Sequence, residues 1–176
     1  MRADARRNYD RILAVATETV ARDGAEVSLE EIARRAGVGS ATLHRHFASR
    51  TALLQVVFHD RVEALAARAG ALAGDPDPAA ALITWLRELG AYASTTRGLP
   101  VSLLQSALDN DCHAMLADAG RELLTRAQGA TDIRPDITIE DLIALVTAIA
   151  LAGERTAGTG GESDRLLVLA LHGIRS

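Results

Sequence analysis

The spacing of apolar side chains along the chain predicts a protein built from α-helices. Ile12, Ala16 and Val20 recur every four residues with charged side chains between them, which predicts a first helix over about residues 8–23. Gly24 follows at once and is expected to end this helix. The chain therefore begins with one amphipathic helix.

A capping box comes next, in the sequence Ser28-Leu29-Glu30-Glu31. The Ser28 hydroxyl can accept a hydrogen bond from the Glu31 amide, while the Glu31 carboxylate reaches back to the Ser28 amide. This motif predicts a second helix that begins at Leu29. Gly37 is expected to end it, because glycine takes the left-handed conformation of a helix exit without steric cost.

A tight turn at residues 37–39 separates this helix from a short third one, which Ser40 is expected to cap. Leu43 and Phe47 stand at i and i+4 and are expected to face inward. The step of about 100° per residue then turns four side chains largely outward: Ala41, Thr42, His44 and Arg45. Two helices joined by a glycine-containing turn, the second with a polar outer face, form the helix-turn-helix that enters the major groove of DNA.

The rest of the chain continues the helical pattern. A fourth helix is expected to start after Ser49, and Gly-Asp-Pro-Asp-Pro at residues 74–78 forms the clearest linker. Later helices are expected from about residue 82, and at about residues 101–108, 111–128, 139–155 and 163–175. We predict an all-α fold, with an N-terminal three-helix DNA-binding domain at residues 1–54 and a C-terminal helical domain at residues 55–176.

Composition supports a globular, helical protein. The chain has 176 residues, of which 48% are apolar and only 3% aromatic. The single cysteine, Cys112, excludes an internal disulfide, and the charged N-terminus does not resemble a secretory signal. The longest apolar run, residues 142–152, falls short of the roughly 20 residues that span a bilayer. We therefore expect a cytoplasmic protein that does not contact a membrane.

Charge is distributed unevenly along the chain. The net charge is −4, yet residues 1–60 carry nine Arg against eight acids, and residues 61–176 carry ten Arg against fifteen. Residues 32–59 contain four Arg and no acid. This local basic stretch is typical of a small module that binds phosphates, in spite of the negative total.

The motifs just described closely resemble the tetracycline-repressor (TetR) family in order and spacing over about residues 8–57. The resemblance rests on Arg-Ile-Leu at 11–13, Gly24, Ser-Leu-Glu-Glu-Ile-Ala at 28–33, Ala-Gly-Val at 36–38, Thr-Leu-His-Arg-His-Phe at 42–47 and Arg-Thr-Ala-Leu-Leu at 50–54. It implies a homodimer that binds a palindromic double-stranded DNA operator, and a divergent C-terminal domain whose small-molecule effector releases the DNA. Neither a cofactor nor a catalytic step is expected.

The resemblance also assigns contacts to single residues. The family's operator contacts correspond to Ser40, Thr42, His44 and His46. Ser28 and Arg50 correspond to phosphate anchors, and Arg45 can donate to a guanine edge or to a phosphate by its own chemistry. The family usually has Tyr where this chain has His44. That imidazole lacks the reach and stacking surface of a phenol but can donate to phosphate, and it adds charge when protonated.

Two sets of C-terminal residues are candidates for the effector and for the second subunit. An apolar effector pocket and ordinary core packing are both open for Trp85, Tyr92, Leu103, Leu104, Cys112 and Met115. The last two helices have wide apolar faces, for which a dimer seam and the monomer core are both open. The resemblance favours a four-helix dimer interface involving Leu142, Val146, Ile149, Leu166, Leu169 and Ala170. Such a dimer spaces two recognition helices by roughly 34–36 Å.

Two other function classes remain as alternatives. A small helical enzyme could use Asp111, Cys112 and His113, although a buried thiol after a polar helix start is the simpler interpretation. A helical adaptor could bind another protein through its apolar C-terminal faces. No metal site is predicted, because His44 and His46 at i and i+2 point about 200° apart on a helix.

Overall fold

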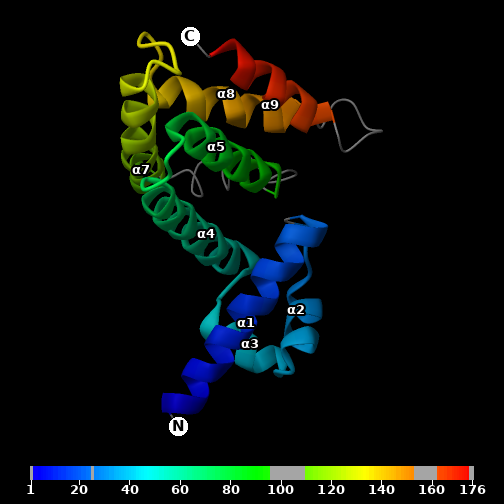
Figure 1. The fold of residues 1–176 in the computed structure, drawn as a ribbon. Coiled ribbons are helices and arrows are strands. Elements are labelled where there is room, and N and C mark those ends of the chain that lie inside the picture. Colours follow the sequence, from blue (N-terminus) through cyan, green and yellow to red (C-terminus); the bar gives the residue numbers. More distant parts are fainter. Residues whose placement is uncertain (1, 25, 96–109, 153–161, 175–176) are drawn as a thin grey trace. The chain divides into compact units, whose positions relative to one another are not determined.

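The computed structural model describes residues 2–24, 26–95, 110–152 and 162–174. Every regular element in these ranges is an α-helix, which confirms the predicted fold class (Figure 1). The helices are α1 (Arg2–Asp23), α2 (Leu29–Ala36), α3 (Ser40–His46), α4 (Arg50–Leu72), α5 (Pro78–Thr95), α7 (Asn110–Gly129), α8 (Ile139–Ala152) and α9 (Glu162–Gly173). The described chain divides into two compact units, with the division after Arg61, inside α4. The predicted helix at 101–108 lies outside the described residues.

The first helix is longer than its apolar pattern indicated, since it begins at Arg2 rather than near residue 8. Its early turns have few apolar side chains to bury, but they contain opposite charges at helical spacing. Arg7 pairs with Asp4, and Arg6 pairs with Asp10 at 3.3 Å. Such i,i+3 and i,i+4 pairs stabilise a helical segment that has few apolar side chains to bury.

The N-terminal unit has a core formed by its successive helices. α1 contacts both α2 and α3, and α2 contacts α3. Leu43 and Phe47 are buried, as predicted. The other core side chains of α1 to α4 in this unit are Ile12, Ala16, Val20, Val27, Ile32, Ala33, Ala36, Leu53, Leu54, Val57 and Phe58. This core fixes the outer faces of α2 and α3.

The end of α2 and the start of α4 agree with those predicted from the sequence, whereas the predicted cap of α3 does not. Gly37 ends α2 with a φ of 63°, in the left-handed region, and its N–H is bonded to carbonyls of α2. Ser49 caps α4 by accepting from the Ala52 amide at 3.1 Å. Ser40 does not cap α3, which is a correction to the prediction: Gly39 is the N-cap, and no side chain bonds there.

In the C-terminal unit, α5 is positioned by a turn and by one large side chain. Asp77 accepts from the Ala80 amide at 2.9 Å, and Pro78 occupies the first helical position, where its missing N–H costs nothing. Trp85 is fully buried, and its Nε1 donates to the Leu65 carbonyl at 2.9 Å. The ring lies against Gly120 of α7, where a Cβ atom would stand only 2.7 Å from it. α5 is thus attached to both α4 and α7.

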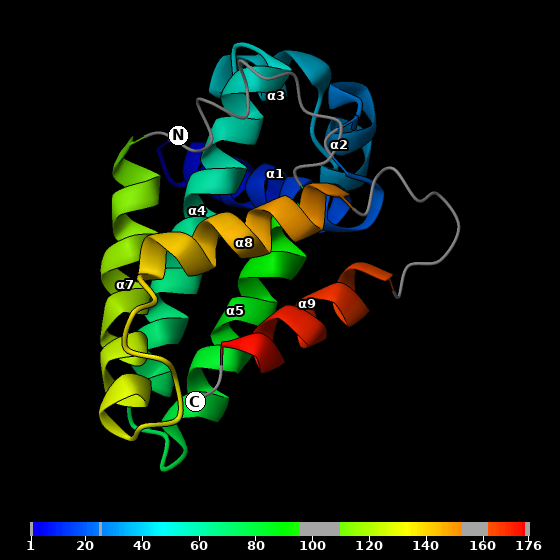
Figure 2. The ribbon, with the colours of Figure 1, turned by 90° about the horizontal axis from the view of Figure 1, so that it is seen from above.

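The last two helices, α8 and α9, complete the helical packing of the C-terminal unit. α8 contacts both α7 and α9, and Figure 2 shows α8 and α9 as neighbouring helices. Gly90 of α5 permits close approach, because a Cβ atom there would meet Leu167 at 3.2 Å and Val146 at 3.3 Å. Thr138 caps α8 through a reciprocal pair of hydrogen bonds with Asp141. No helix within the described ranges is long and apolar enough to cross a membrane.

Candidate nucleic-acid interface

The outer face of α3 presents the polar side chains expected of a recognition helix. Ser40, His44 and Arg45 are exposed, whereas Thr42 and His46 are half-buried. All five are side chains predicted to contact DNA. Because Leu43 and Phe47 anchor the opposite face, the direction of this polar surface is fixed by the core.

Arg45 is held along α3 by hydrogen bonds within its own helix. Its Nη2 donates to the Thr42 hydroxyl at 2.8 Å, and its Nε donates to the Ala41 carbonyl at 3.3 Å. It forms no salt bridge with any acid in the described part of the chain. A guanidinium that is oriented but not neutralised suits bidentate contact with guanine or phosphate.

His46 belongs to an aromatic cluster that the sequence did not reveal. Tyr9 of α1 stacks on Phe47 with ring centroids 5.1 Å apart, and it meets His46 edge-on at 5.9 Å. These geometries are favourable for aromatic pairs. The only sequence signal was an aromatic residue in the first helix of a chain with 3% aromatics, one turn before Ile12. Tyr9 thus connects the first helix to the end of the recognition helix.

Ser28 uses its hydroxyl within the protein. It accepts from the Glu31 amide at 3.3 Å, as predicted, and it donates to Glu30 Oε2 at 2.8 Å. The pKa of Glu30 is lowered by hydrogen bonds from its own backbone and from Ser28, with a smaller contribution from His44. A phosphate at Ser28 therefore competes with a carboxylate for the hydroxyl proton.

The second hydrogen bond predicted for the capping box, from the Ser28 amide to the Glu31 carboxylate, is wrong. The Glu31 carboxylate does not reach back to Ser28 but accepts from Arg34 at 2.7 and 2.9 Å and from Arg35 at 2.6 Å. Two guanidiniums outcompete one backbone amide for the same carboxylate, because bonds between charged partners are the stronger ones. These bonds lower the pKa of Glu31 to about 2, with that from Arg34 as the largest cause.

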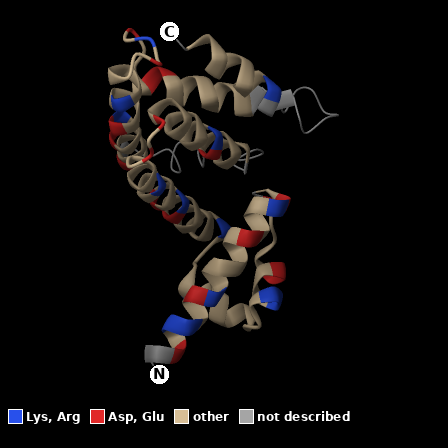
Figure 3. Ribbon diagram, viewed as in Figure 1, with Lys and Arg blue, Asp and Glu red and all other residues tan. Residues whose placement is uncertain are grey.

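The basic stretch predicted at residues 32–59 is therefore largely neutralised in space. Glu31 pairs with Arg34 and Arg35, and Arg50 lies 3.4 Å from Glu26. Figure 3 shows acidic and basic positions side by side on α1 and α2. Glu26 and Glu31 both precede residue 32, so a count of charges over residues 32–59 does not include them. Of its four Arg, only Arg45 lacks a described acidic partner.

Arg11 supports the turn of the helix-turn-helix. Its Nη2 donates to the Ala36 carbonyl at 2.5 Å, and the same atom lies 2.7 Å from where a Cβ atom on Gly37 would stand. A cation at the C-terminus of α2 also interacts favourably with the helix dipole. The sequence motif contained Arg11, but its spacing gave no indication of this contact.

Comparisons with known proteins agree with this geometry. Residues 12–57 match the family model "Bacterial regulatory proteins, tetR family", and residues 77–176 match "Transcriptional regulator SbtR-like, C-terminal domain". A TetR transcriptional regulator from Streptomyces coelicolor is 34% identical, with a TM-score of 0.74 over 95% of this chain and 98% of that chain. The chain belongs to the TetR family. It is a DNA-binding transcriptional regulator.

Other relatives share the fold of this TetR-family protein. A TetR regulatory protein from Mycobacterium vanbaalenii is 32% identical, with a TM-score of 0.67 over 99% of both chains. The regulator FadR from Bacillus subtilis, in complex with stearoyl-CoA, is 17% identical with a TM-score of 0.63 over 94% of this chain and 99% of that chain, a likeness of fold alone. A search of curated proteins finds no match.

Of the four predicted effector residues that the structure describes in this TetR-family chain, three lie in the core. Trp85, Tyr92 and Cys112 are buried and Met115 is half-buried, while Leu103 and Leu104 lie outside the described residues. The nitrogen of Trp85 is already bonded to the protein. A pocket among the described residues lies between α5 and α9, and Trp85, Tyr92, Cys112 and Met115 are not among its lining residues.

The candidate dimer residues divide into three groups by exposure. Leu142 and Val146 are only 1% exposed, so they belong to the core of the single chain. Leu166 and Leu169 of α9 are 40% and 57% exposed. Ile149 and Ala170 are half-buried. An apolar surface available to a second subunit is therefore concentrated on α9.

The three residues of the alternative enzyme hypothesis do not point into one site: Asp111, Cys112 and His113. Cys112 is buried, whereas Asp111 and His113 are exposed on either side of it along α7. The thiol therefore faces the core while its two neighbours face solvent. Within the described ranges, no group of three or more metal-ligating side chains is close enough to hold a metal ion.

Proposed function

We propose that this TetR-family regulator represses transcription as a homodimer bound to a palindromic operator, and that a small-molecule effector in the C-terminal unit releases it. The observation that carries the DNA-binding part is Arg45, an exposed guanidinium on the recognition helix without a described acidic partner. Phosphate contacts supply much of the affinity for DNA, and base contacts such as Arg to guanine supply specificity. Thr42, already bonded to Arg45, holds it in place for such a contact.

Ser28, Ser40, His44, His46 and Arg50 surround Arg45 in this proposal. Ser40 and His44 are exposed on the same outer face of α3 and offer short contacts to bases or phosphates. Arg50 and Ser28 act as phosphate anchors once DNA phosphate displaces Glu26 and Glu30 from them. This exchange replaces an internal acid with a phosphate, so each contact adds less affinity than a free cation would.

The dimer part of the proposal rests on the exposed leucines of α9. Leu166 and Leu169 are 40% and 57% exposed and stand three positions apart on α9, so they form one exposed apolar patch. Two copies joined through this surface present two recognition helices to half-sites about one DNA turn, roughly 34–36 Å, apart. Effector and operator then weaken each other's binding by the same factor. That FadR shares this fold and is in complex with stearoyl-CoA supports a ligand-responsive C-terminal unit.

The test is selection of bound fragments from a library of the source genome, followed by fluorescence anisotropy on the selected sequence. We expect a palindromic site with a steep salt dependence. Arg45→Ala should weaken binding by about 1–3 kcal/mol without changing stability. Arg34→Ala is the matched control, because Arg34 is also exposed but already paired with Glu31. A protein that prefers no genomic fragment over random DNA contradicts the proposal.

A separate experiment tests the dimer. Leu169→Asp places a charge in the proposed seam and should yield a monomer by analytical ultracentrifugation. Ala148→Asp, at an exposed position of α8, is the control for an added surface charge. If Leu169→Asp leaves a dimer of unchanged affinity, the seam lies on another face.

A further inference from the structure

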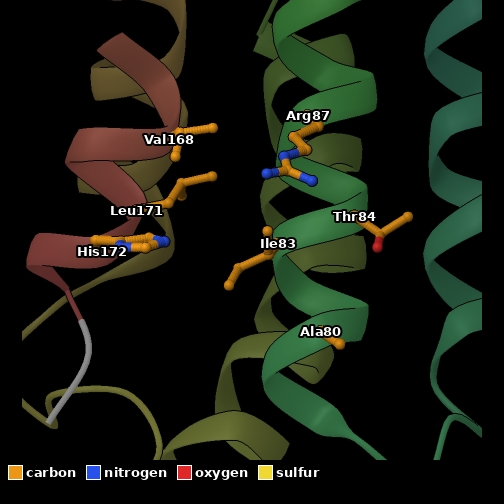
Figure 4. Close-up of a pocket in the computed structure, with 7 residues that line it drawn as sticks. All are labelled: Ala80, Ile83, Thr84, Arg87, Val168, Leu171 and His172. Atoms are coloured by element: carbon orange, nitrogen blue, oxygen red, sulfur yellow. The ribbon is translucent and has the colours of Figure 1, made fainter. Parts of the chain in front are cut away.

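A groove of about 240 Å³ lies between α5 and α9 of the C-terminal unit. Figure 4 shows Ile83 reaching from α5 towards α9, and Val168 and Leu171 reaching from α9 towards α5. Arg87 and His172 contribute nitrogen donors from the two helices. The residues that line the groove are Ala80, Ile83, Thr84, Arg87, Val168, Leu171 and His172.

The charge of the residues that line this groove is positive. None of its seven lining residues is an acid, although acids outnumber Arg in this part of the sequence. Arg87 forms no salt bridge or hydrogen bond with another residue in the described ranges, and the same is true of His172. By contrast Glu88, the next residue along α5, is paired with Arg68 at 3.1 Å. The groove therefore combines an apolar wall with a guanidinium that the described chain leaves without an anion.

We propose that this groove binds a small organic carboxylate with a short apolar tail. The planar fork of Arg87 matches a carboxylate, and the imidazole of His172 can donate a further hydrogen bond to it. Ile83, Val168 and Leu171 then cover the apolar tail. The volume is below the range of about 300–1,000 Å³ that is usual for drug-sized ligands, so the ligand is a small one.

Most of the groove lies away from the proposed dimer seam. At about 100° per residue, Val168 and Leu171 point to one side of α9, and Leu166 and Ala170 point to nearly the opposite side. Leu169 lies between His172 and Leu166, about 60° from each. The apolar tail of the ligand thus contacts α9 on the side away from Leu166 and Ala170. This inference deepens the proposed function. Ligand binding in the groove does not depend on the proposed function, but its regulatory consequence does: a carboxylate that moves α9 changes the geometry of the dimer and hence its affinity for DNA.

The test uses the full chain and an NMR titration with hexanoate, with hexanamide as its neutral isostere. Hexanoate should shift the amide signals of α5 and α9 around Ile83 and Leu171 in a saturable manner, and hexanamide should bind at least about tenfold more weakly. Arg87→Gln should weaken hexanoate by a similar factor. Arg165→Gln is the matched control, because Arg165 is exposed on α9 and does not line the groove.

Equal binding of hexanoate and hexanamide, or unchanged binding to Arg87→Gln, overturns the proposed site. Inorganic phosphate serves as a third probe: if it binds as tightly as hexanoate, the groove selects charge alone and the carboxylate proposal is wrong. The regulatory part is measured separately, as hexanoate-dependent release of operator DNA. A chain that binds hexanoate in the groove but recognises no specific DNA contradicts the proposed function and leaves the site intact.

Discussion

The N-terminal and C-terminal units differ in how far apart in sequence their packing partners lie. In the N-terminal unit, α1, α2 and α3 all contact one another within residues 2–47. In the C-terminal unit, Trp85 joins Leu65 to Gly120, and Gly90 meets both Val146 and Leu167. The first unit is therefore specified by local signals such as caps and helical spacing. The second depends on close fits between distant helices, which no local pattern encodes.

The largest expected effect tests whether Trp85 is a core residue or part of an effector pocket. Trp85→Ala should lower the free energy of unfolding by about 3–5 kcal/mol, because it leaves a cavity between α5 and α7 and removes the hydrogen bond from Nε1 to the Leu65 carbonyl. Urea denaturation measures this. Trp85→Phe, which keeps most of the ring volume, should lose clearly less. If Trp85→Ala instead keeps full stability and abolishes a ligand response, the residue lines a pocket.

A local signal of the N-terminal unit is tested at Gly37. Gly37→Ala should cost about 1–2 kcal/mol of unfolding free energy, because its φ of 63° is unfavourable for a residue with a Cβ atom and Arg11 lies in the way. Gly37→Asn should lose less, since Asn tolerates this conformation better. Urea denaturation distinguishes the two. Identical losses would mean that contact with Arg11, and not the backbone conformation, sets the cost.

The aromatic cluster tests a contact within the N-terminal unit that does not follow from local spacing. Tyr9→Leu should lower stability by about 0.5–1.5 kcal/mol, because it removes the stack on Phe47 and the edge contact with His46. Operator affinity, measured by fluorescence anisotropy, should fall as well. Tyr9→Phe keeps the ring and should retain stability. Unchanged affinity in Tyr9→Leu would show that His46 needs no support from α1.

The smallest effect concerns pH. The pKa of Glu31 falls from 4.5 to about 2 because Arg34 and Arg35 bind its charged form. The stabilisation from these bonds is therefore fully present above pH 4.5 and is lost as the pH falls towards 2. The unfolding free energy of the wild type, measured against Glu31→Gln through this range, should show a difference that disappears in acid. A constant difference contradicts the assignment.

Prediction from sequence succeeded where one residue acts on its near neighbours. The Ser28 cap, the Gly37 exit and the buried pair of Leu43 and Phe47 each follow from spacings of three to five residues. The direction of the recognition helix followed from the same signals. Its contacts with DNA remain predictions, because they depend on a partner that spacing does not describe.

Prediction failed where side chains compete or where distant segments meet. Glu31 had two kinds of partner within reach, and the sequence alone did not show that Arg34 and Arg35 would be preferred over the Ser28 amide. The groove between α5 and α9 joins residues more than eighty positions apart, which no periodicity connects. Leu142 and Leu169 had equivalent patterns, for which core and dimer seam were both open, and of the two the structure exposes only Leu169.

The ion pairs that cover Arg34, Arg35 and Arg50 have a consequence for the search through a genome. A regulator meets about 10⁶–10⁹ competing non-specific sites, and each uncovered cation adds to the time spent on them. With these guanidiniums held by Glu31 and Glu26, each adds less affinity for random DNA than a free cation would. In the proposed function, fewer molecules are then occupied along the chromosome, and a small number of copies per cell can keep an operator filled.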